Sequence, residues 1–266
     1  MNKQLKQLIE VITPVVQLLN LKQFVKSTGR KLAIPIIQLL SIGVYWKKFN
    51  IKTKKSVYET LDISQYCSYK TLCVNLNKFA VILLALLKLA MKHNVEIAET
   101  IKHIDSTDVP VCLIKNSKHH QTMKGKAEYG HSGKGFYYGL KMHLVSDLSG
   151  RFLNLQFTPA NVHDTKPVES LTKDVNGILV ADAGYVSKEL EQKMQREGLR
   201  YMIVKPKRNM KRLATAFDTW AYSTRMQIET NFRNLKEFYG LVTSLPRSVQ
   251  GYLANYIFAL TNCFLK

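Results

Sequence analysis

The chain has few acidic residues for its length. Its 266 residues include 19 Asp and Glu against 39 Lys and Arg, which gives a formal net charge of +20 at pH 7. Solubility does not require an excess of this size, and a surface of one sign attracts polyanions. The charge balance therefore indicates a polyanionic partner, with nucleic acid first and an anionic membrane surface second.

Cysteine and long hydrophobic runs are also scarce. The four cysteines are Cys67, Cys73, Cys112 and Cys263. No two of them have the C-x2-C spacing of a zinc knuckle, so we expect free thiols in a reducing cytosol. The longest apolar run, Phe79–Leu87, stops at Lys88 and is short for a bilayer span, so no membrane partner is expected.

Hydrophobic residues make up 46% of the chain, which is enough for a sizeable core. We predict two domains, residues 1–95 and 96–266. Over residues 1–95 apolar side chains recur at helical spacing, with Pro14 as a kink or break. Two short helices around a turn near Asp62–Ser64 would suit a helix-turn-helix DNA reader. A plain helical bundle with a basic surface is the alternative for this all-α region.

Residues 96–266 predict a mixed α/β domain, with a five-stranded mixed sheet flanked by helices. The expected strands are Ile101–Ser106, Phe136–Ser146, Arg151–Thr158, Gly177–Ala181 and Tyr201–Lys205. The expected helices are Asp164–Lys173, Ser187–Glu197, Tyr222–Phe238 and Ser248–Phe264. Asp164 is expected to be a helix N-cap, and the alternative is that His163 and Asp164 lie near the metal ions considered below. Between the first two strands, Thr107–Gly135 is expected to form a basic loop or insertion.

Three of the few acids occupy informative positions. Asp105 ends the first expected strand, Asp182 follows the buried run Gly177–Ala181, and Glu229 lies on a later helix. If the first and fourth strands are neighbours, the two aspartates emerge at one edge, and the helix brings the glutamate across. Converging carboxylates repel one another, but they suit hard divalent cations, which prefer oxygen ligands. A turn or cap role is the simpler alternative for each aspartate.

The stretch Tyr222–Lys236 places polar residues at regular intervals. On a helix with about 100° per residue, Tyr222, Arg225, Glu229 and Lys236 project from one narrow arc beside the apolar face. A carboxylate in that arc would be half-sheltered and flanked by two cations. The alternative is an ordinary surface helix in which Arg225 and Glu229 form an i,i+4 pair.

Together these residues resemble the DDE transposases of bacterial insertion sequences, in the insertion sequence 4-like or 982-like branch. The spacing Tyr222-x2-Arg225-x3-Glu229-x6-Lys236 matches the Y-R-E-K signature of that family. The segments similar to other family motifs are Ile104–Thr107, Gly139–His143, Asn161–Asp164 and Asp182–Tyr185. The resemblance covers about residues 100–264, and the spacing combined with both Asp motifs makes it specific.

The resemblance implies an RNase H-like fold and a transposase that cuts DNA at element ends and transfers the strands into target DNA. It implies that Asp105, Asp182 and Glu229 hold two Mg²⁺ ions, for which Mn²⁺ can substitute. Arg225 and Lys236 would contact phosphates, with Tyr222 beside the scissile strand. The implied partners are double-stranded DNA and a second copy of the chain, in the bacterial cytosol on the nucleoid. No small-molecule substrate is implied.

Five further residues are candidates for DNA contact. Lys141 and His143 share one face of their strand by period-two alternation, and a packing or solvated role is the alternative for both. The remaining three, Lys205, Lys207 and Arg208, belong to the basic run KPKRNMKR. That run is either a solvated loop or one that grips phosphates.

Two other functions fit the same residues. An RNase H-like nuclease would cut DNA without joining it, and a catalytically inactive relic would only bind DNA. We favour transposition over the nuclease because the match extends beyond the three acids to Tyr222, Arg225 and Lys236. The intact acids count against the relic.

Overall fold

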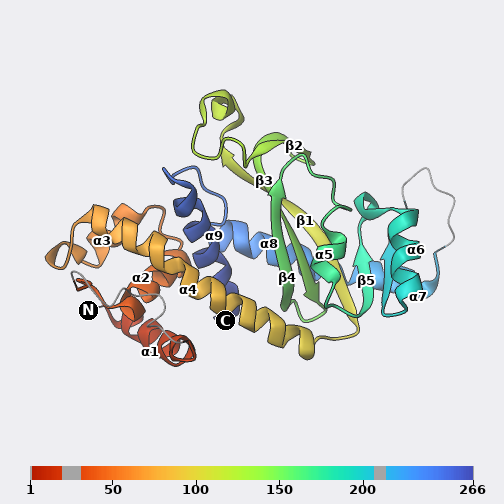
Figure 1. The fold of residues 1–266 in the computed structure, drawn as a ribbon, viewed down its shortest axis with the longest axis horizontal. Coiled ribbons are helices and arrows are strands. Elements are labelled where there is room, and N and C mark those ends of the chain that lie inside the picture. The colour runs from red at the N-terminus through yellow and green to blue at the C-terminus, as the bar shows by residue number, and fades with distance from the viewer. Residues whose placement is uncertain (1, 20–30, 207–213, 266) are drawn as a thin grey trace. The chain divides into compact units, whose positions relative to one another are not determined.

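The computed structural model describes residues 2–19, 31–206 and 214–265 (Figure 1). The chain divides into two compact units: unit 1 contains residues 1–90 and 234–266, and unit 2 contains residues 91–233. The first division falls between residues 90 and 91, and the sequence analysis placed a domain boundary at residue 95. The second groups the C-terminal segment with the N-terminal helices, an association that the sequence pattern did not indicate.

Unit 1 is helical in the part that the structure describes. Its elements are α1 (Lys3–Gln17), α2 (Ile36–Lys48), α3 (Lys54–Thr60), η2 (Ile63–Gln65), most of α4 (Tyr69–Glu96), η5 (Asn234–Phe238) and α9 (Val249–Phe264). The buried side chains of α1 keep the expected helical spacing, and Pro14 lies inside that helix without ending it. α2 packs against α1 and α9, and Asn262 donates a hydrogen bond to the Val44 carbonyl at 3.3 Å.

The segment proposed as a DNA reader has the order helix, turn, helix. Asp62 adopts a left-handed conformation with φ 46° in the turn between α3 and α4. By length and composition alone α4 could cross a membrane, but a buried core helix passes the same test, and 44% of its apolar window is buried. DNA reading by this segment stays a prediction.

Unit 2 is built on one sheet. Its strands are β1 (Ile101–Cys112), β2 (Glu128–Ser132), β3 (Gly135–Asp147), β4 (Phe152–Pro159), β5 (Gly177–Ala181) and β6 (Arg200–Val204). They form a 6-stranded sheet in the order β2-β3-β1-β5-β6, with β4 also paired to β3. β5 runs parallel to β1 and to β6, whereas β1, β2 and β4 are antiparallel to β3. The mixed α/β class is therefore confirmed.

The expected loop 107–135 contains the strand that the sequence analysis did not predict. β1 continues beyond Asp105 because its pairing with β3 extends to Cys112. The helical turn η3 (Ile114–His119) follows, and then β2 pairs with the start of β3 across a tight turn, Ser132 opposite Gly135. Basic residues and glycines in this segment hide the period-two alternation by which a strand is predicted.

Helices cover both faces of the sheet. On one face, α5 (Val168–Thr172) and α6 (Lys188–Glu197) pack on a core that includes Ile104 and Leu179. On the other face, Ala221 of α7 (Ala216–Ser223) packs against Ile101 and Val180. α6 begins at an N-cap serine and ends at a left-handed glycine, as expected.

Two expected helices differ from the structure. α5 begins at Val168 with Pro167 as its N-cap, so the prediction that Asp164 caps this helix is wrong. The single helix expected over Tyr222–Phe238 is divided into α7, α8 (Met226–Arg233) and the π-helical turn η5. The break falls at Thr224, whose hydroxyl donates to the Ala221 carbonyl at 2.7 Å and so competes with the helical backbone.

Gly139 shows how tightly β1 and β3 approach. A Cβ atom at this position would lie 2.3 Å from the Val109 carbonyl oxygen, which is backbone and cannot turn aside. We predict that Gly139→Ala lowers the free energy of unfolding by about 1–3 kcal/mol. Gly133→Ala is the matched control, because nothing lies within 4 Å of its added Cβ. Urea denaturation of both variants tests this prediction, which equal midpoints would contradict.

Candidate active site

The two aspartates predicted as ligands lie on neighbouring strands, just after the point where the parallel pairing of β1 and β5 ends. The last parallel pair between β1 and β5 joins Ile104 to Ala181. The next residue on each strand is an aspartate, Asp105 on one and Asp182 on the other. The register of the sheet therefore places these two carboxylates side by side, as the sequence analysis expected for adjacent first and fourth strands.

Arg225 bridges the two carboxylates. Its Nη2 lies 2.9 Å from Asp105 Oδ2 and its Nη1 lies 3.4 Å from Asp182 Oδ1. The Asp105 side chain is 19% exposed and that of Asp182 is 49% exposed, so only one carboxylate faces solvent broadly. Burial raises the pKa of Asp105 to about 6, although the arginine and the Ser106 N–H favour its charged form.

A buried histidine holds the helix break against β1. His103 Nε2 lies 2.8 Å from the Thr224 hydroxyl, beside Arg225. Burial, followed by the nearby Arg225 charge, lowers the pKa of His103 to about 4, so the imidazole is neutral at pH 7. The sequence analysis did not identify His103. The available signal was its spacing of two from Asp105, which puts both side chains on the same face of the strand.

Asp164 also lies close to this site. Its Oδ1 accepts a hydrogen bond from Ser106 Oγ at 2.9 Å and lies 3.0 Å from Lys141 Nζ. Ser106 directly follows Asp105, and a Cβ at Gly184 would lie 3.4 Å from Asp164 Oδ2. Both aspartate motifs therefore border the Asp164 carboxylate, which the sequence analysis assigned to a helix cap.

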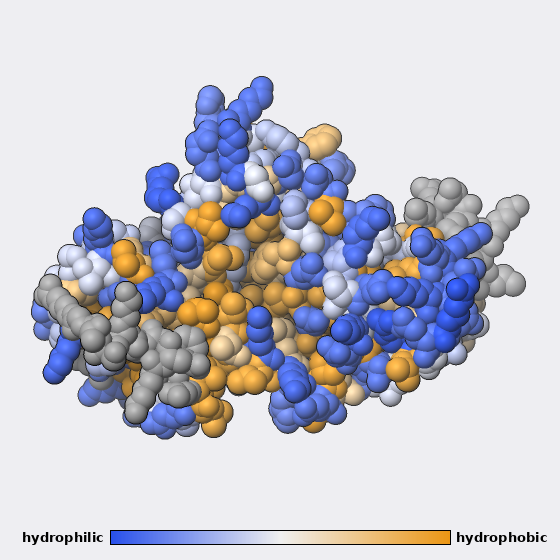
Figure 2. All heavy atoms as spheres, in the orientation of Figure 1, coloured by the Kyte–Doolittle hydropathy of each residue, from blue (hydrophilic) through white to orange (hydrophobic). Residues whose placement is uncertain are grey.

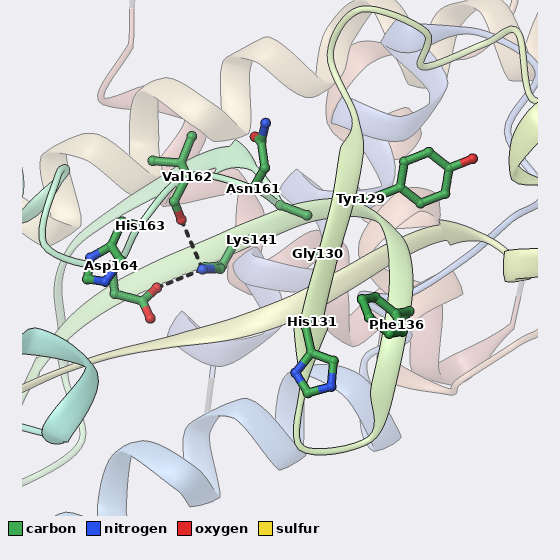
Figure 3. Close-up of a pocket in the computed structure, with 10 residues that line it drawn as sticks. Tyr129, Gly130, His131, Phe136, Lys141, Asn161, Val162, His163 and Asp164 are labelled. Carbon is green, nitrogen blue, oxygen red and sulfur yellow. Dashed lines mark hydrogen bonds and ion pairs between the residues drawn. The ribbon is translucent and has the colours of Figure 1, made fainter. Parts of the chain in front are cut away.

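A pocket of about 340 Å³ opens beside Asp164 (Figure 3). Lys141 crosses it, donating to the Val162 carbonyl at 3.0 Å as well as pairing with Asp164. The β2–β3 hairpin supplies His131 and Phe136 on the other side, with ring centroids 5.0 Å apart. Lys141 is thus held within the protein in this conformation.

Two other residues with predicted DNA contacts are engaged inside the protein. The His143 side chain is fully buried, and its Nε2 lies 2.9 Å from the Thr158 hydroxyl. This is the packing role that the sequence analysis left open, and it leaves no part of the imidazole for DNA to contact. The Tyr222 hydroxyl donates to the Val204 carbonyl at 2.6 Å, which ties α7 to the end of β6.

Glu229 lies in the first turn of α8, one turn after Arg225, and is exposed. Within the part of the chain that the structure describes, its carboxylate has no hydrogen-bond or ion-pair partner, so the alternative pairing with Arg225 is not formed. Across the same described residues, no three His, Cys, Asp or Glu side chains are grouped closely enough to hold a metal ion. In this conformation Arg225, and not Glu229, is the side chain that contacts both Asp105 and Asp182.

The remaining predicted contacts are distributed over the chain. Lys205 is exposed directly after β6, and its N–H donates to the Ala181 carbonyl at 3.1 Å, next to Asp182. Lys236 is half-buried in η5, which belongs to unit 1. Lys207 and Arg208 lie outside the described residues.

Comparison with protein families agrees with the fold. A family model described as "Transposase DDE domain" matches residues 96–249. The match covers more than half of the chain, so the protein belongs to this transposase family. The curled mixed sheet flanked by helices, with a helical region before it, is the RNase H-like fold of such domains. A search of curated proteins found no match to this chain.

Members of the DDE transposase family generally use divalent metal ions, and the donors in this site fit such an ion. Asp105 and Asp182 offer carboxylate oxygens from adjacent strands, and they already share one positive group. Hard divalent cations prefer such oxygen ligands. Asp182 is half exposed, which leaves it accessible from solvent.

The raised pKa of Asp105 predicts a pH-dependent stability in EDTA. The carboxyl titrates near 3.8 when unfolded and about 6 when folded. Its contribution to stability is therefore fully present below the lower value and lost as pH rises through the higher one. The Asp105→Asn side chain does not titrate, so this variant lacks that pH-dependent contribution. The unfolding free energy of Asp105→Asn minus that of wild type should therefore increase by on the order of 1–3 kcal/mol between about pH 4 and pH 7. Chemical denaturation at several pH values measures this difference, and a difference that is constant with pH would contradict the raised pKa.

Arg225 and a metal ion would use the same carboxylate oxygens, so they should compete. We predict that Arg225→Gln destabilises the metal-free protein by about 1–3 kcal/mol, because two carboxylates lose their cation. The same change should increase Mn²⁺ affinity several-fold, as measured by titration calorimetry. Arg196→Gln is the control, since Arg196 is exposed on α6. Weaker Mn²⁺ binding by Arg225→Gln would instead show that the arginine positions the aspartates for the metal.

Proposed function

We propose that this protein cleaves DNA at the ends of a mobile element and joins the freed strands to target DNA. The observation that carries the proposal is the aspartate pair that directly follows the parallel β1–β5 pairing, bridged by Arg225. The pair occurs in a chain of the DDE transposase family. The Y-R-E-K spacing supports the insertion sequence 4-like or 982-like branch.

The reaction would proceed in two balanced displacements at phosphorus. In the first, a water oxygen bonds to the phosphorus at the element end, the bond to the 3′-oxygen breaks, and that oxygen leaves as a 3′-hydroxyl. In the second, this hydroxyl oxygen bonds to a target phosphorus and displaces a target 3′-oxygen. The first step hydrolyses one phosphodiester, and the second makes one phosphodiester for the one it breaks, so no external energy source is needed. When bound, Mg²⁺ or Mn²⁺ polarises the phosphoryl oxygen and the attacking water.

We assign three carboxylates to hold the metal ions: Asp105, Asp182 and Glu229. The first two are already adjacent, and Glu229 is exposed and without a described partner, so it is available to join them. Arg225 then exchanges its carboxylate partners for a DNA phosphate, for which its planar guanidinium is suited. His103 keeps Thr224 on β1 during this exchange, and Lys236 contributes a second phosphate contact.

Exposed cations of unit 2 offer a surface for double-stranded DNA. Lys205 lies next to Asp182 at the end of β6. The segment around η3 carries the exposed lysines Lys115, Lys118, Lys124 and Lys126. Figure 2 shows that the surface over this segment, at the top of the view, is covered by hydrophilic residues. We propose that a dimer in the bacterial cytosol holds two element ends through such surfaces, with Lys207 and Arg208 in the adjoining basic run.

A nicking and joining assay tests this function. Wild-type protein with Mg²⁺ should nick a duplex carrying an element end and join it to a plasmid. Asp182→Asn should lower both rates by at least about 100-fold, because a metal ligand is lost. Asp174→Asn is the matched control, since Asp174 is exposed and lies before β5.

The products distinguish the remaining functions. Nicked ends without joined products would support a nuclease that only cuts. DNA binding in EDTA without nicking in Mg²⁺ or Mn²⁺ would support an inactive relic. Nicking retained in Asp182→Asn would show that the site assignment is wrong.

A further inference from the structure

Unit 1 contains a groove of about 740 Å³ that the catalytic residues of unit 2 do not use. It is lined by α2, α3 and the start of α4 from the N-terminal half of the chain, and by residues 243–255 from the C-terminal segment. Four of its lining residues are cations: Lys54, Lys55, Lys70 and Arg247. None of the described residues that line it is acidic, so the groove is suited to an anion.

Most of these cations are not neutralised by the protein. Lys55 pairs with Glu59 at 3.3 Å on the exposed surface of α3. Lys54 donates to a neutral amide oxygen, that of Asn77 at 2.6 Å, and its ammonium lies 5.2 Å from the centroid of the Trp46 ring. Among the residues that the structure describes, Lys70 and Arg247 have no ion-pair partner. Burial lowers the pKa of Lys54, which shows that its charge is poorly compensated in the empty groove.

Two helix N-termini add to the positive potential. Tyr69 and Lys70 are the first residues of the long helix α4, and Ser248 is the N-cap of α9. The first turn of a helix carries unpaired N–H groups and a partial positive charge, which favours anions such as phosphate. Here these ends adjoin the four lysine and arginine side chains, so both contributions act on the same space.

Two lining residues also have unmet hydrogen-bonding capacity. Trp46 is 5% exposed and its Nε1 donor has no partner. Asn255 is fully buried; its amide donates to the Gly240 and Leu241 carbonyls, while its Oδ1 acceptor is unpaired. Unpaired buried polar groups cost free energy. Both atoms are shielded from solvent, so an occupant relieves this cost only if it displaces the side chains that cover them and offers both an acceptor and a donor. The edge of a nucleobase offers both.

We infer that this groove binds an unpaired segment of a DNA strand, with phosphates at Lys70 and Arg247 and a base towards Trp46 and Asn255. The volume is that of a site for a small ligand, so it admits about one or two nucleotides but not a duplex. Cations combined with aromatic side chains are the usual means of holding single strands. The inference rests on the proposed function for the source of the strand, because cutting at an element end leaves DNA ends that can fray.

Tryptophan fluorescence provides a direct readout. The chain has 2 tryptophans, Trp46 in the groove and Trp220 on α7 of unit 2. In a full-length Trp220→Phe variant, the emission reports on Trp46 alone. Titration with an oligothymidylate of about ten nucleotides, in EDTA, should quench this emission at saturation. The same strand annealed into a blunt duplex, and free thymidine monophosphate, should quench it much more weakly.

Charge reversal at the groove, with a matched control, locates the binding site. In the Trp220→Phe background, Lys70→Glu should weaken oligothymidylate binding by about tenfold, because a phosphate contact becomes repulsive. Lys6→Glu changes the net charge equally on exposed α1 and should alter the affinity by less than about twofold. Circular dichroism checks that both variants are folded.

Several results would overturn the inference. One is an equal loss of oligothymidylate affinity in Lys70→Glu and Lys6→Glu. The others are oligothymidylate binding without any change in Trp46 emission, and quenching by the duplex as strong as quenching by the single strand. Because binding is measured in EDTA, its failure is separate from failure of the proposed function. A groove that binds in a protein that never nicks DNA would contradict only the transposition chemistry. Normal nicking with no groove binding would contradict only the groove.

Discussion

Two carboxylates on adjacent strands repel one another unless a cation lies between them, and unit 2 is organised around this constraint. The parallel register of β1 and β5 leaves no alternative, since the residue after the last pair is an aspartate on both strands. In the metal-free protein Arg225 supplies the positive charge. The fold therefore places a positive group between the two aspartates, and a divalent metal ion would satisfy the same requirement with greater charge.

The break between α7 and α8 is a consequence of the same site. Thr224 keeps helical backbone angles of φ −71° and ψ −12°, so the break does not depend on an extended residue. The structure anchors the turn at Thr224 through His103 and anchors α7 through Tyr222 and the Val204 carbonyl. Residues of the Y-R-E-K spacing thus serve two purposes, because Tyr222 joins elements while Arg225 reaches the carboxylates.

The parts of the fold that the sequence predicted are those with strong local signals. The apolar run Gly177–Ala181 forms β5, and α6 lies between its serine cap and its left-handed glycine, because neighbouring residues suffice to specify both elements. β2 was not predicted, since its pairing with β3 supplies the stabilisation that its own sequence lacks. The grouping of the C-terminal segment with the N-terminal helices was likewise hidden, because periodicity carries no information on which distant helices pack together.

The sequence by itself determined the excess of positive charge, the identity of the acids and the spacing that indicates a DDE transposase. These depend only on which residues are present and on their local periods. Tertiary structure alone decided that Asp164 binds Ser106 and Lys141 instead of capping a helix, and that Arg225 contacts Asp105 and Asp182 instead of Glu229. The partner of a charged side chain is chosen by the elements that fold around it, and here those elements are separated by many residues along the chain.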